Sequence, residues 1–333
     1  MKRARRLLAA ASCAAVVLWI GGNLPGQYQK DPPDFSGSDY KFPTPTHPEP
    51  YAGWERTLDA GLLAVGLAVA AWLILKKRSR VGVILLGMAS LAWFGFWRKG
   101  CICPIGAIQN VSLCLADPRY AVSLTIVAIF FLPLVAALFF GRVFCGGVCP
   151  HGAIQDLVLL KPLRIPRTLD RLLGLLKYAY LAVAVWFAAW GFAPFLGGDP
   201  DITQASRRFV ICEWDPFVGL FRLNGSFHML LIGAGFVIAG MFIGRPYCRW
   251  LCPYGALLAI LSRVSWKSVR ITPDKELDCG LCAEACPYGA IEDLRAVKAS
   301  CLSCTRCYEF CPRERELKKC PGDAPPLVQV ELQ

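Results

Sequence analysis

Long apolar runs restrict this chain of 333 residues to a membrane fold. A helix needs about 20 apolar residues to cross a hydrocarbon core of about 30 Å. Charged residues make up only 18% of the chain, against about 25% in soluble proteins. We therefore predict an α-helical polytopic membrane domain over residues 1–265. Its expected transmembrane helices, about six in number, are 7–24, 57–75, 81–97, 120–140, 172–196 and 227–244.

The placement of basic residues predicts the orientation of these helices. Lys2, Arg3, Arg5 and Arg6 precede the first apolar run, which resembles a signal peptide and which we interpret as a retained anchor. With the N-terminus inside, the cytoplasmic segments carry more Lys and Arg than the outer ones, as the positive-inside rule expects. The expected location is a bacterial-type inner (cytoplasmic) membrane, with several passes and both termini cytoplasmic.

The first expected outer loop, 25–55, is rich in proline. This composition favours extended, polyproline-like chain over a packed core. It is either a solvated loop or a strap that lies over a partner on the outer face.

The polar segment that follows the last apolar run carries cysteines at ferredoxin spacing. It contains Cys279-x2-Cys282-x3-Cys286-Pro and Cys301-x2-Cys304-x2-Cys307-x3-Cys311-Pro. In the bacterial ferredoxin run, three closely spaced thiolates bind one cluster and the cysteine before proline ligates the other. Residues 266–322 are therefore expected to form a small α+β domain with two [4Fe–4S] clusters, and 323–333 a tail.

The first ferredoxin run departs from this pattern, because Glu276 stands where its first cysteine should be. The second cluster is left without an obvious fourth thiolate. Cys320 could supply it, as could a carboxylate from Glu276 or Asp278, and a [3Fe–4S] cluster is the remaining option. The complete cluster has the ligands Cys286, Cys301, Cys304 and Cys307, and the incomplete one has Cys279, Cys282 and Cys311.

A second cysteine pattern is repeated inside the membrane domain. Residues 141–154 read Gly-Arg-x-x-Cys-x3-Cys-Pro-x-Gly-Ala-Ile, and residues 244–257 repeat the pattern with a final Leu. Cys-x3-Cys places two sulfurs one helical turn apart, and the proline suits the first position of a following helix. We expect the four thiolates of Cys145, Cys149, Cys248 and Cys252 to converge on one iron–sulfur cluster, zinc or copper site near the cytoplasmic face.

A third site is expected at the opposite face. Cys101-Ile-Cys103-Pro shares the Cys-Pro-x-Gly-Ala-Ile tail, and Cys212 precedes Glu213 and Asp215 in the second half. These three cysteines are candidates for a further cluster or metal, and a disulfide is the alternative in an oxidising compartment. Cys13 and Cys114 are interpreted as packing residues.

The two Gly-Arg-x-x-Cys-x3-Cys-Pro-x-Gly-Ala units, followed by a two-cluster ferredoxin, resemble the NapH/NosR-type membrane polyferredoxins. That group includes a membrane quinol-dehydrogenase subunit and the cupric reductase of cytochrome oxidase assembly. The resemblance covers about residues 57–321. It implies electron transfer between the quinone pool, or a cytoplasmic donor, and redox subunits on the outer face and on the cytoplasmic face. Unlike the nitrous oxide type, this chain has no outer flavin domain, so no intrinsic flavin is expected.

Other chemistries find little support in the sequence. His47, His151 and His228 are the only histidines, so multi-haem chemistry is not expected. The net charge of +12 fits membrane loops better than nucleic acid. His151 either handles a quinol proton or caps a helix, and His228 is interpreted as an interfacial residue.

Two functions remain. The first is a membrane electron-transfer subunit that relays electrons through iron–sulfur clusters. It would be part of a membrane oxidoreductase complex, of which a quinol dehydrogenase is one example. The alternative is metal handling or cofactor maturation, with the Cys-x3-Cys-Pro pairs binding copper and the ferredoxin domain as reductant.

Overall fold

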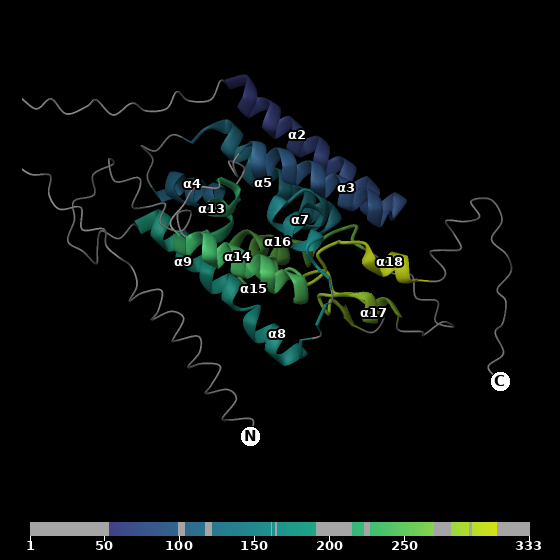
Figure 1. The fold of residues 1–333 in the computed structure, drawn as a ribbon. Coiled ribbons are helices and arrows are strands. Elements are labelled where there is room, and N and C mark those ends of the chain that lie inside the picture. Colours follow the sequence, from purple (N-terminus) through teal and green to yellow (C-terminus); the bar gives the residue numbers. More distant parts are fainter. Residues whose placement is uncertain are drawn as a thin grey trace, which may run out of the picture. The chain divides into compact units, whose positions relative to one another are not determined.

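The computed structural model describes nine ranges of the chain, and these are predominantly helical (Figure 1). They are residues 53–98, 104–116, 122–160, 162–163, 165–190, 215–222, 227–269, 281–292 and 295–311. All of them belong to one compact unit, Tyr51–Gln333. The expected anchor 7–24, almost all of the loop 25–55 and the tail 323–333 lie outside the described residues.

Three of the described helices are long and apolar enough to cross a membrane, at Thr57–Lys77, Arg80–Trp97 and Arg167–Ala189. Four shorter apolar helices accompany them, at Ile105–Ala116, Leu124–Phe140, Met229–Phe242 and Pro253–Ser262. The expected spans 120–140 and 227–244 therefore appear as shorter helices. The helix near 105–116 was not expected from the sequence, whereas the proline after Cys252 predicted the start of the helix at 253–262.

The element bounds are as follows. The first half contains α2 (Gly53–Ala71), η1 (Trp72–Lys77), α3 (Arg80–Ser90), η2 (Leu91–Trp97), α4 (Pro104–Ala116), α5 (Leu124–Phe140), α6 (Val143–Gly147) and α7 (Pro150–Leu157). The second half contains α8 (Arg167–Leu173), α9 (Leu176–Trp190), α13 (Pro216–Arg222), α14 (Phe227–Phe242), α15 (Pro246–Trp250) and α16 (Pro253–Ser262). The cysteine-rich segment contains α17 (Leu281–Ala285), β1 (Ile291–Glu292), β2 (Arg295–Ala296) and α18 (Arg306–Phe310).

The turn between the first two long helices has a local cause. Arg78 ends η1 in the left-handed conformation, with φ of 49°. Ser79 then begins α3, because its hydroxyl accepts a hydrogen bond from the Gly82 amide at 3.3 Å and so satisfies an otherwise unpaired donor of the first turn. Farther along this hairpin, Arg98 and Asp59 form a buried ion pair at 2.6 Å, which joins η2 to α2.

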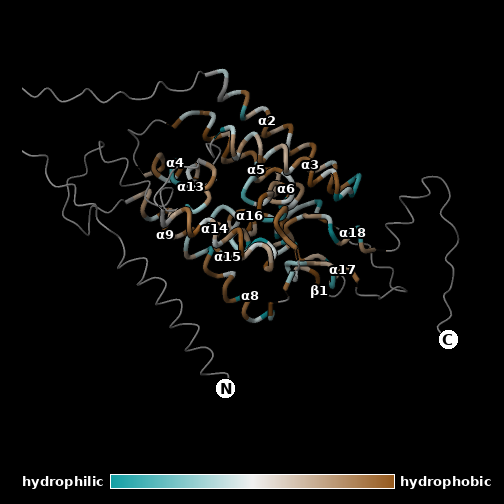
Figure 2. The backbone as a smooth tube through the Cα atoms, in the orientation of Figure 1, coloured by the Kyte–Doolittle hydropathy of each residue, from teal (hydrophilic) through white to brown (hydrophobic). Residues whose placement is uncertain are grey.

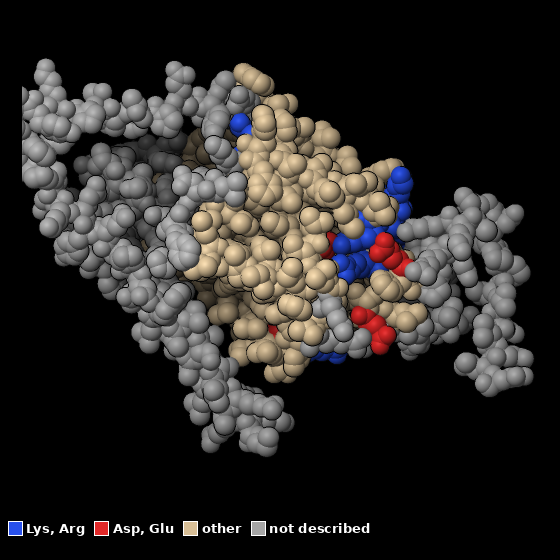
Figure 3. Space-filling model, viewed as in Figure 1, with Lys and Arg blue, Asp and Glu red and all other residues tan. Residues whose placement is uncertain are grey.

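Hydrophobic residues predominate along the long helices (Figure 2), and most charged residues on the face in Figure 3 lie near one end. Leu85, Met88, Val135 and Ile238 are all exposed. An exposed apolar surface over several long helices is what a hydrocarbon core requires. On the face in Figure 3, Lys, Arg, Asp and Glu cluster mostly near α18 and the first turn of α3.

The segment 281–311, here named the cluster lobe, packs against this charged end. Its strands β1 and β2 pair antiparallel, with Ile291 opposite Ala296, and its helix α18 contacts α3. The Lys298 ammonium donates to the Ser265 carbonyl at 2.6 Å. The Ser262 hydroxyl donates to the Lys298 carbonyl at 3.1 Å. The lobe is therefore joined to α16 and the chain that follows it by hydrogen bonds as well as by packing.

The lobe packs tightly against α6 at Gly146. A Cβ on this residue would lie 2.6 Å from the Ser303 carbonyl oxygen and 3.1 Å from that of Leu302. Both neighbours are backbone atoms, so they cannot rotate away. Only glycine lets α6 touch the lobe here.

We predict that Gly146→Ala destabilises the protein by about 1–3 kcal/mol, the usual cost of overpacking a close-packed site. Helix propensity alone would favour alanine in α6, so a loss of stability isolates the steric effect. The measurement is thermal unfolding of the purified protein in detergent. Gly235→Ala in α14 is the control, because its Cβ would meet nothing within 4 Å. An unfolding temperature for Gly146→Ala as high as that of Gly235→Ala would contradict this packing.

Candidate iron–sulfur sites

The four cysteines of the internal repeat line one small cavity. Cys145, Cys149, Cys248 and Cys252 share it with a wall of mainly aromatic and aliphatic side chains, namely Ile105, Phe144, His151, Tyr247, Tyr254 and Leu258. The cavity therefore joins both halves of the repeat. We name it the four-cysteine site.

Each half of the repeat positions its cysteines in the same way. Cys145 lies in α6 and Cys248 in α15, while Cys149 and Cys252 are the N-cap residues of α7 and α16. Proline occupies the first turn of both following helices, as predicted. The first backbone N–H groups of a helix have no partner within the helix. The sulfur of the N-cap cysteine can therefore accept a hydrogen bond from one of them.

The arginine of each repeat packs against the other repeat, an arrangement that we call the arginine exchange. The Arg245 guanidinium donates to the Cys145 carbonyl, and a Cβ on Gly152 would lie 3.1 Å from its Nη1. Conversely, a Cβ on Gly255 would lie 3.2 Å from Nη2 of Arg142. Each repeat thus uses its glycine to admit the arginine of the other, which explains why Arg and Gly recur together in the motif.

Every sulfur of the four-cysteine site meets one N–H donor. Gln155 Nε2 donates to Cys248 Sγ at 3.3 Å, and Gly255 N donates to Cys252 Sγ at 3.3 Å. Arg142 Nη2 lies 3.8 Å from Cys145 Sγ. Burial and the neighbouring thiols raise the pKa of Cys149, and a hydrogen bond from the Gly152 amide acts in the opposite direction. Such donors stabilise negative charge on sulfur, which suits iron–sulfur ligation.

Burial also raises the pKa of Cys248 to about 12, although the nearby Arg245 lowers it. A thiol of this kind stays protonated near neutral pH unless a cation binds it. The described residues contain no group of three or more His, Cys, Asp or Glu side chains arranged to hold a single metal ion.

The cluster lobe brings together the four cysteines expected to hold the complete cluster. Burial, with the neighbouring Cys304 and Cys286, raises the pKa of Cys301 to about 12. Burial likewise raises the pKa of Cys307, and Cys304, Cys301 and Cys286 again add to the effect. The four sulfurs are thus close enough to interact. Cys282 and Cys311 also belong to the described lobe.

The loop around Cys304 has a strained backbone. Ser303 and Thr305 both have positive φ, 55° and 64°, and both are buried. Such conformations cost free energy and persist where the surroundings enforce them. The loop presents the Cys304 carbonyl to Arg80 Nη1, which donates to it at 2.7 Å.

A buried carboxylate joins the lobe to the helices. Asp156 forms ion pairs with Arg80 and with Arg245, the latter at 3.3 Å, and accepts a hydrogen bond from the Tyr288 hydroxyl at 3.2 Å. Burial alone would raise the pKa of Asp156, but Arg245 and Arg80 outweigh it and lower the pKa. Asp156 is therefore ionised, and it holds together α3, α7, the second repeat and the lobe.

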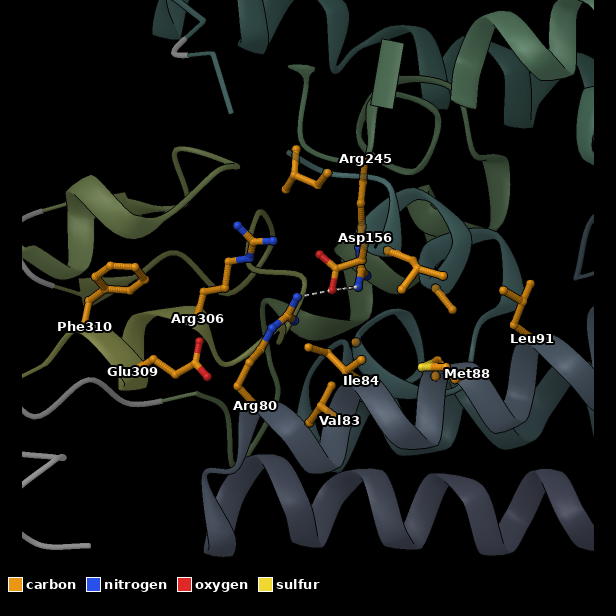
Figure 4. Close-up of a pocket in the computed structure, with 15 residues that line it drawn as sticks. Arg80, Val83, Ile84, Met88, Leu91, Asp156, Arg245, Arg306, Glu309 and Phe310 are labelled. Atoms are coloured by element: carbon orange, nitrogen blue, oxygen red, sulfur yellow. Dashed lines mark hydrogen bonds and ion pairs between the residues drawn. The ribbon is translucent and has the colours of Figure 1, made fainter. Parts of the chain in front are cut away.

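An amphipathic cavity of about 390 Å³ opens beside this carboxylate (Figure 4). Val83, Ile84 and Met88 of α3 and Leu91 of η2 form its apolar wall. Its polar end consists of Arg80, Asp156, Arg245, Arg306 and Glu309. Gly146 lines it too. We name it the junction cavity, because its lining includes neighbours of ligands in both cysteine sites.

His151 lies beside the four-cysteine site and not in the junction cavity. Its ring packs among Phe217, Phe221 and Tyr247, and its Nε2 lies 3.7 Å from an oxygen of the buried Asp215. The sequence analysis grouped Asp215, which directly precedes α13, with Cys212 in the candidate site at the opposite face, whereas the structure places its carboxylate beside His151.

Several sequence-predicted residues lie outside the described ranges, and their roles stay predictions. They are Cys101, Cys103, Cys212, Cys279, Cys320, Glu276, Asp278 and Cys13, and nothing is described of the His228 side chain. Cys114 is exposed on α4. The sequence analysis missed the roles of Asp156, Gln155 and Gly146, although Gly152 and Gly255 were visible as repeated positions.

Comparison with known proteins supports this assignment of the sites. A family described as a 4Fe-4S binding domain matches residues 122–167 and again 226–271, so both halves of the repeat match separately. A second family with the same description matches 277–292. YccM of Escherichia coli, named as an electron transport protein, is 30% identical over 154 residues, 44% of this chain and 40% of YccM.

Two further relatives point the same way. NirI of Paracoccus denitrificans is 28% identical over 178 residues, 50% of this chain and 24% of NirI. The regulatory protein NosR of Pseudomonas aeruginosa is 28% identical over 128 residues, 33% of this chain and 18% of NosR. Together these matches support the resemblance of the chain to the NapH/NosR-type membrane polyferredoxins.

The chain is a membrane protein with 4Fe-4S binding domains. Its alignments cover no more than 40% of the length of these three relatives. No solved structure matches it.

The Asp156 network predicts the effect of Asp156→Asn. Removal of one partner leaves two buried guanidinium groups uncompensated, which costs about 3–5 kcal/mol. Because the native pKa of Asp156 is lowered, its contribution is present above the unfolded pKa and is lost as pH falls through the native pKa. The measurement is thermal unfolding from pH 7 towards pH 3, and the variant should lose less stability than the wild type over that range.

Arg171→Ala provides the matched control. Arg171 pairs with Glu292 of the lobe at 3.2 Å, but both side chains are exposed, so the pair is worth about 1 kcal/mol or less. Equal losses of stability in the two variants would show that Asp156 is not the main connection.

Proposed function

We propose that this protein is a membrane electron-transfer subunit that passes electrons between the cluster lobe and the four-cysteine site, and on to partner redox subunits. One observation carries the proposal. The Leu302–Ser303 backbone, directly before Cys304, touches Gly146, directly after Cys145. A candidate ligand from each site is therefore one residue from the contact.

The residues of the chain act here by holding the two sites together and excluding water. Arg80 links the Cys304 loop to Asp156, and Arg142 donates to the Ala299 carbonyl of the lobe at 3.1 Å. Iron–sulfur clusters bound at the two sites would supply one-electron redox chemistry. Buried donors that are already oriented need little rearrangement when the charge changes.

The junction cavity supports a quinone as one redox partner. Its volume of about 390 Å³ lies within the usual range for small-molecule sites. Met88 and Leu157 line it and are exposed, so an apolar tail could leave towards lipid. Its polar end offers carboxylate and guanidinium groups to the oxygens of the ring. A cytoplasmic donor that docks on the lobe is the other candidate.

The partner at the other end of the relay is expected on the outer face. Cys101, Cys103 and Cys212 would form a further station of the relay. Ile105, two residues after Cys103, lines the four-cysteine site, so this station would adjoin that site. Both termini and the cluster lobe would then be cytoplasmic. The name of the relative YccM, an electron transport protein, makes other redox proteins the expected class of partner.

The alternative is metal handling, with copper at the four-cysteine site. Buried thiolates also suit Cu(I). The N–H donor at every sulfur favours an iron–sulfur cluster, whose charge such donors stabilise.

A double variant, Cys145→Ser with Cys248→Ser, tests the proposal. It removes one thiolate from each repeat, so iron and acid-labile sulfide per chain should fall by one cluster, and one paramagnetic signal of the reduced protein should disappear. The signals of the lobe clusters should remain. The measurements are metal and sulfide analysis and electron paramagnetic resonance of the full chain, purified in detergent without oxygen.

Cys114→Ser is the control. Cys114 is exposed and was predicted to be a packing residue, not a cluster ligand. Unchanged iron and sulfide in the double variant would contradict the proposal. Loss of stoichiometric copper, with iron unchanged, would establish the alternative.

A further inference from the structure

Gln155 is a fully buried amide whose orientation is fixed by its neighbours. Its Oε1 accepts from the Tyr247 backbone amide at 3.1 Å, and its Nε2 donates to the His151 carbonyl at 2.8 Å. A backbone amide can only donate and a carbonyl can only accept, so the side chain cannot be reversed. Its second N–H is therefore directed at Cys248 Sγ, 3.3 Å away.

This donor is a difference between the two halves of the internal repeat. Gln155 corresponds in sequence to Leu258 of the second half, which is also fully buried and lines the four-cysteine site but has no N–H in its side chain. The repeat supplies glycine amides to Cys149 and Cys252 alike. The side-chain amide at Cys248 is an addition to the first half only.

The position of this amide determines what it can do to a bound cluster. Reduction adds one electron to the cluster, and part of the added negative charge resides on the cysteine sulfurs. An N–H directed at such a sulfur stabilises the reduced form more than the oxidised form, and so raises the reduction potential. The effect is strongest where water is excluded, as it is around Gln155.

We propose that Gln155 is a positioning residue that raises the reduction potential of the four-cysteine site by donating its amide hydrogen to Cys248. The inference rests on the proposed function, because it requires a redox cluster at this site. It makes the two halves of the repeat chemically different, and the potential of the site then depends on a residue outside the cysteine motif.

The test is a redox titration of Gln155→Leu in the full chain, with dithionite as the source of the electron and mediators to equilibrate it. The paramagnetic signal to follow is the one that Cys145→Ser with Cys248→Ser abolishes. Leucine fills a similar volume without an N–H, so the equilibrium should shift at least tenfold towards the oxidised form. That corresponds to a midpoint about 59 mV lower for a one-electron couple, with the signal itself retained.

Gln109→Leu is the matched control. Gln109 holds the corresponding position after Cys103-Pro104 and is also fully buried, but it does not line the four-cysteine site. Its variant should leave the midpoint unchanged. If Gln155→Leu fails to assemble the cluster, Gln155→Asn replaces it, because the shorter amide withdraws the N–H from Cys248 and should also lower the midpoint.

The outcomes separate the two claims. A midpoint in Gln155→Leu, or in its replacement, equal to that of the wild type would overturn the role of Gln155 and leave the proposed function intact. Equal shifts in the Gln155 and Gln109 variants would also overturn it, since the effect would then be one of general packing. A wild-type protein with no signal from the four-cysteine site would instead remove the proposed function.

Discussion

The exchange of two buried arginines between the repeats is the interaction on which the rest of the structure depends. Arg245 reaches the Cys145 carbonyl over Gly152, and Arg142 lies over Gly255. Buried guanidinium groups are costly unless they are fully paired, so neither half can form its site without the other. The exchange brings both Cys-x3-Cys pairs to one cavity.

The same arginines extend outward to the cluster lobe. Arg245 pairs with Asp156, which also binds Arg80, and Arg142 reaches the Ala299 carbonyl. The residues that define the four-cysteine site are thus the ones that dock the lobe on it. In physical terms, an electron relay requires short distances that do not fluctuate, and a buried charged network provides them at the cost of desolvation. At Gly146 the helices and the lobe are packed so tightly that a side chain has no room.

Sequence reasoning reached the cysteines but not their surroundings. Ferredoxin spacing and the duplicated motif are local patterns, so the predicted ligands could be named from residue order alone, and the prolines after Cys149 and Cys252 correctly predicted helix starts. Asp156 and Gln155 act through partners that are distant in the sequence, and no spacing reveals such contacts. The apolar runs predicted the membrane character, but the α4 helix escaped because a helix shorter than a full span gives a weak signal.

The central claim is that the four-cysteine site and the cluster lobe hold neighbouring redox centres. Pulsed electron paramagnetic resonance on the fully reduced full-length chain tests this most directly, because spin relaxation of one centre accelerates when a second paramagnet is near. The account predicts that the signal of the four-cysteine site relaxes faster in the wild type than in Cys304→Ser, which loses the neighbouring cluster. Identical relaxation in the two proteins, with the signal present in both, would contradict it.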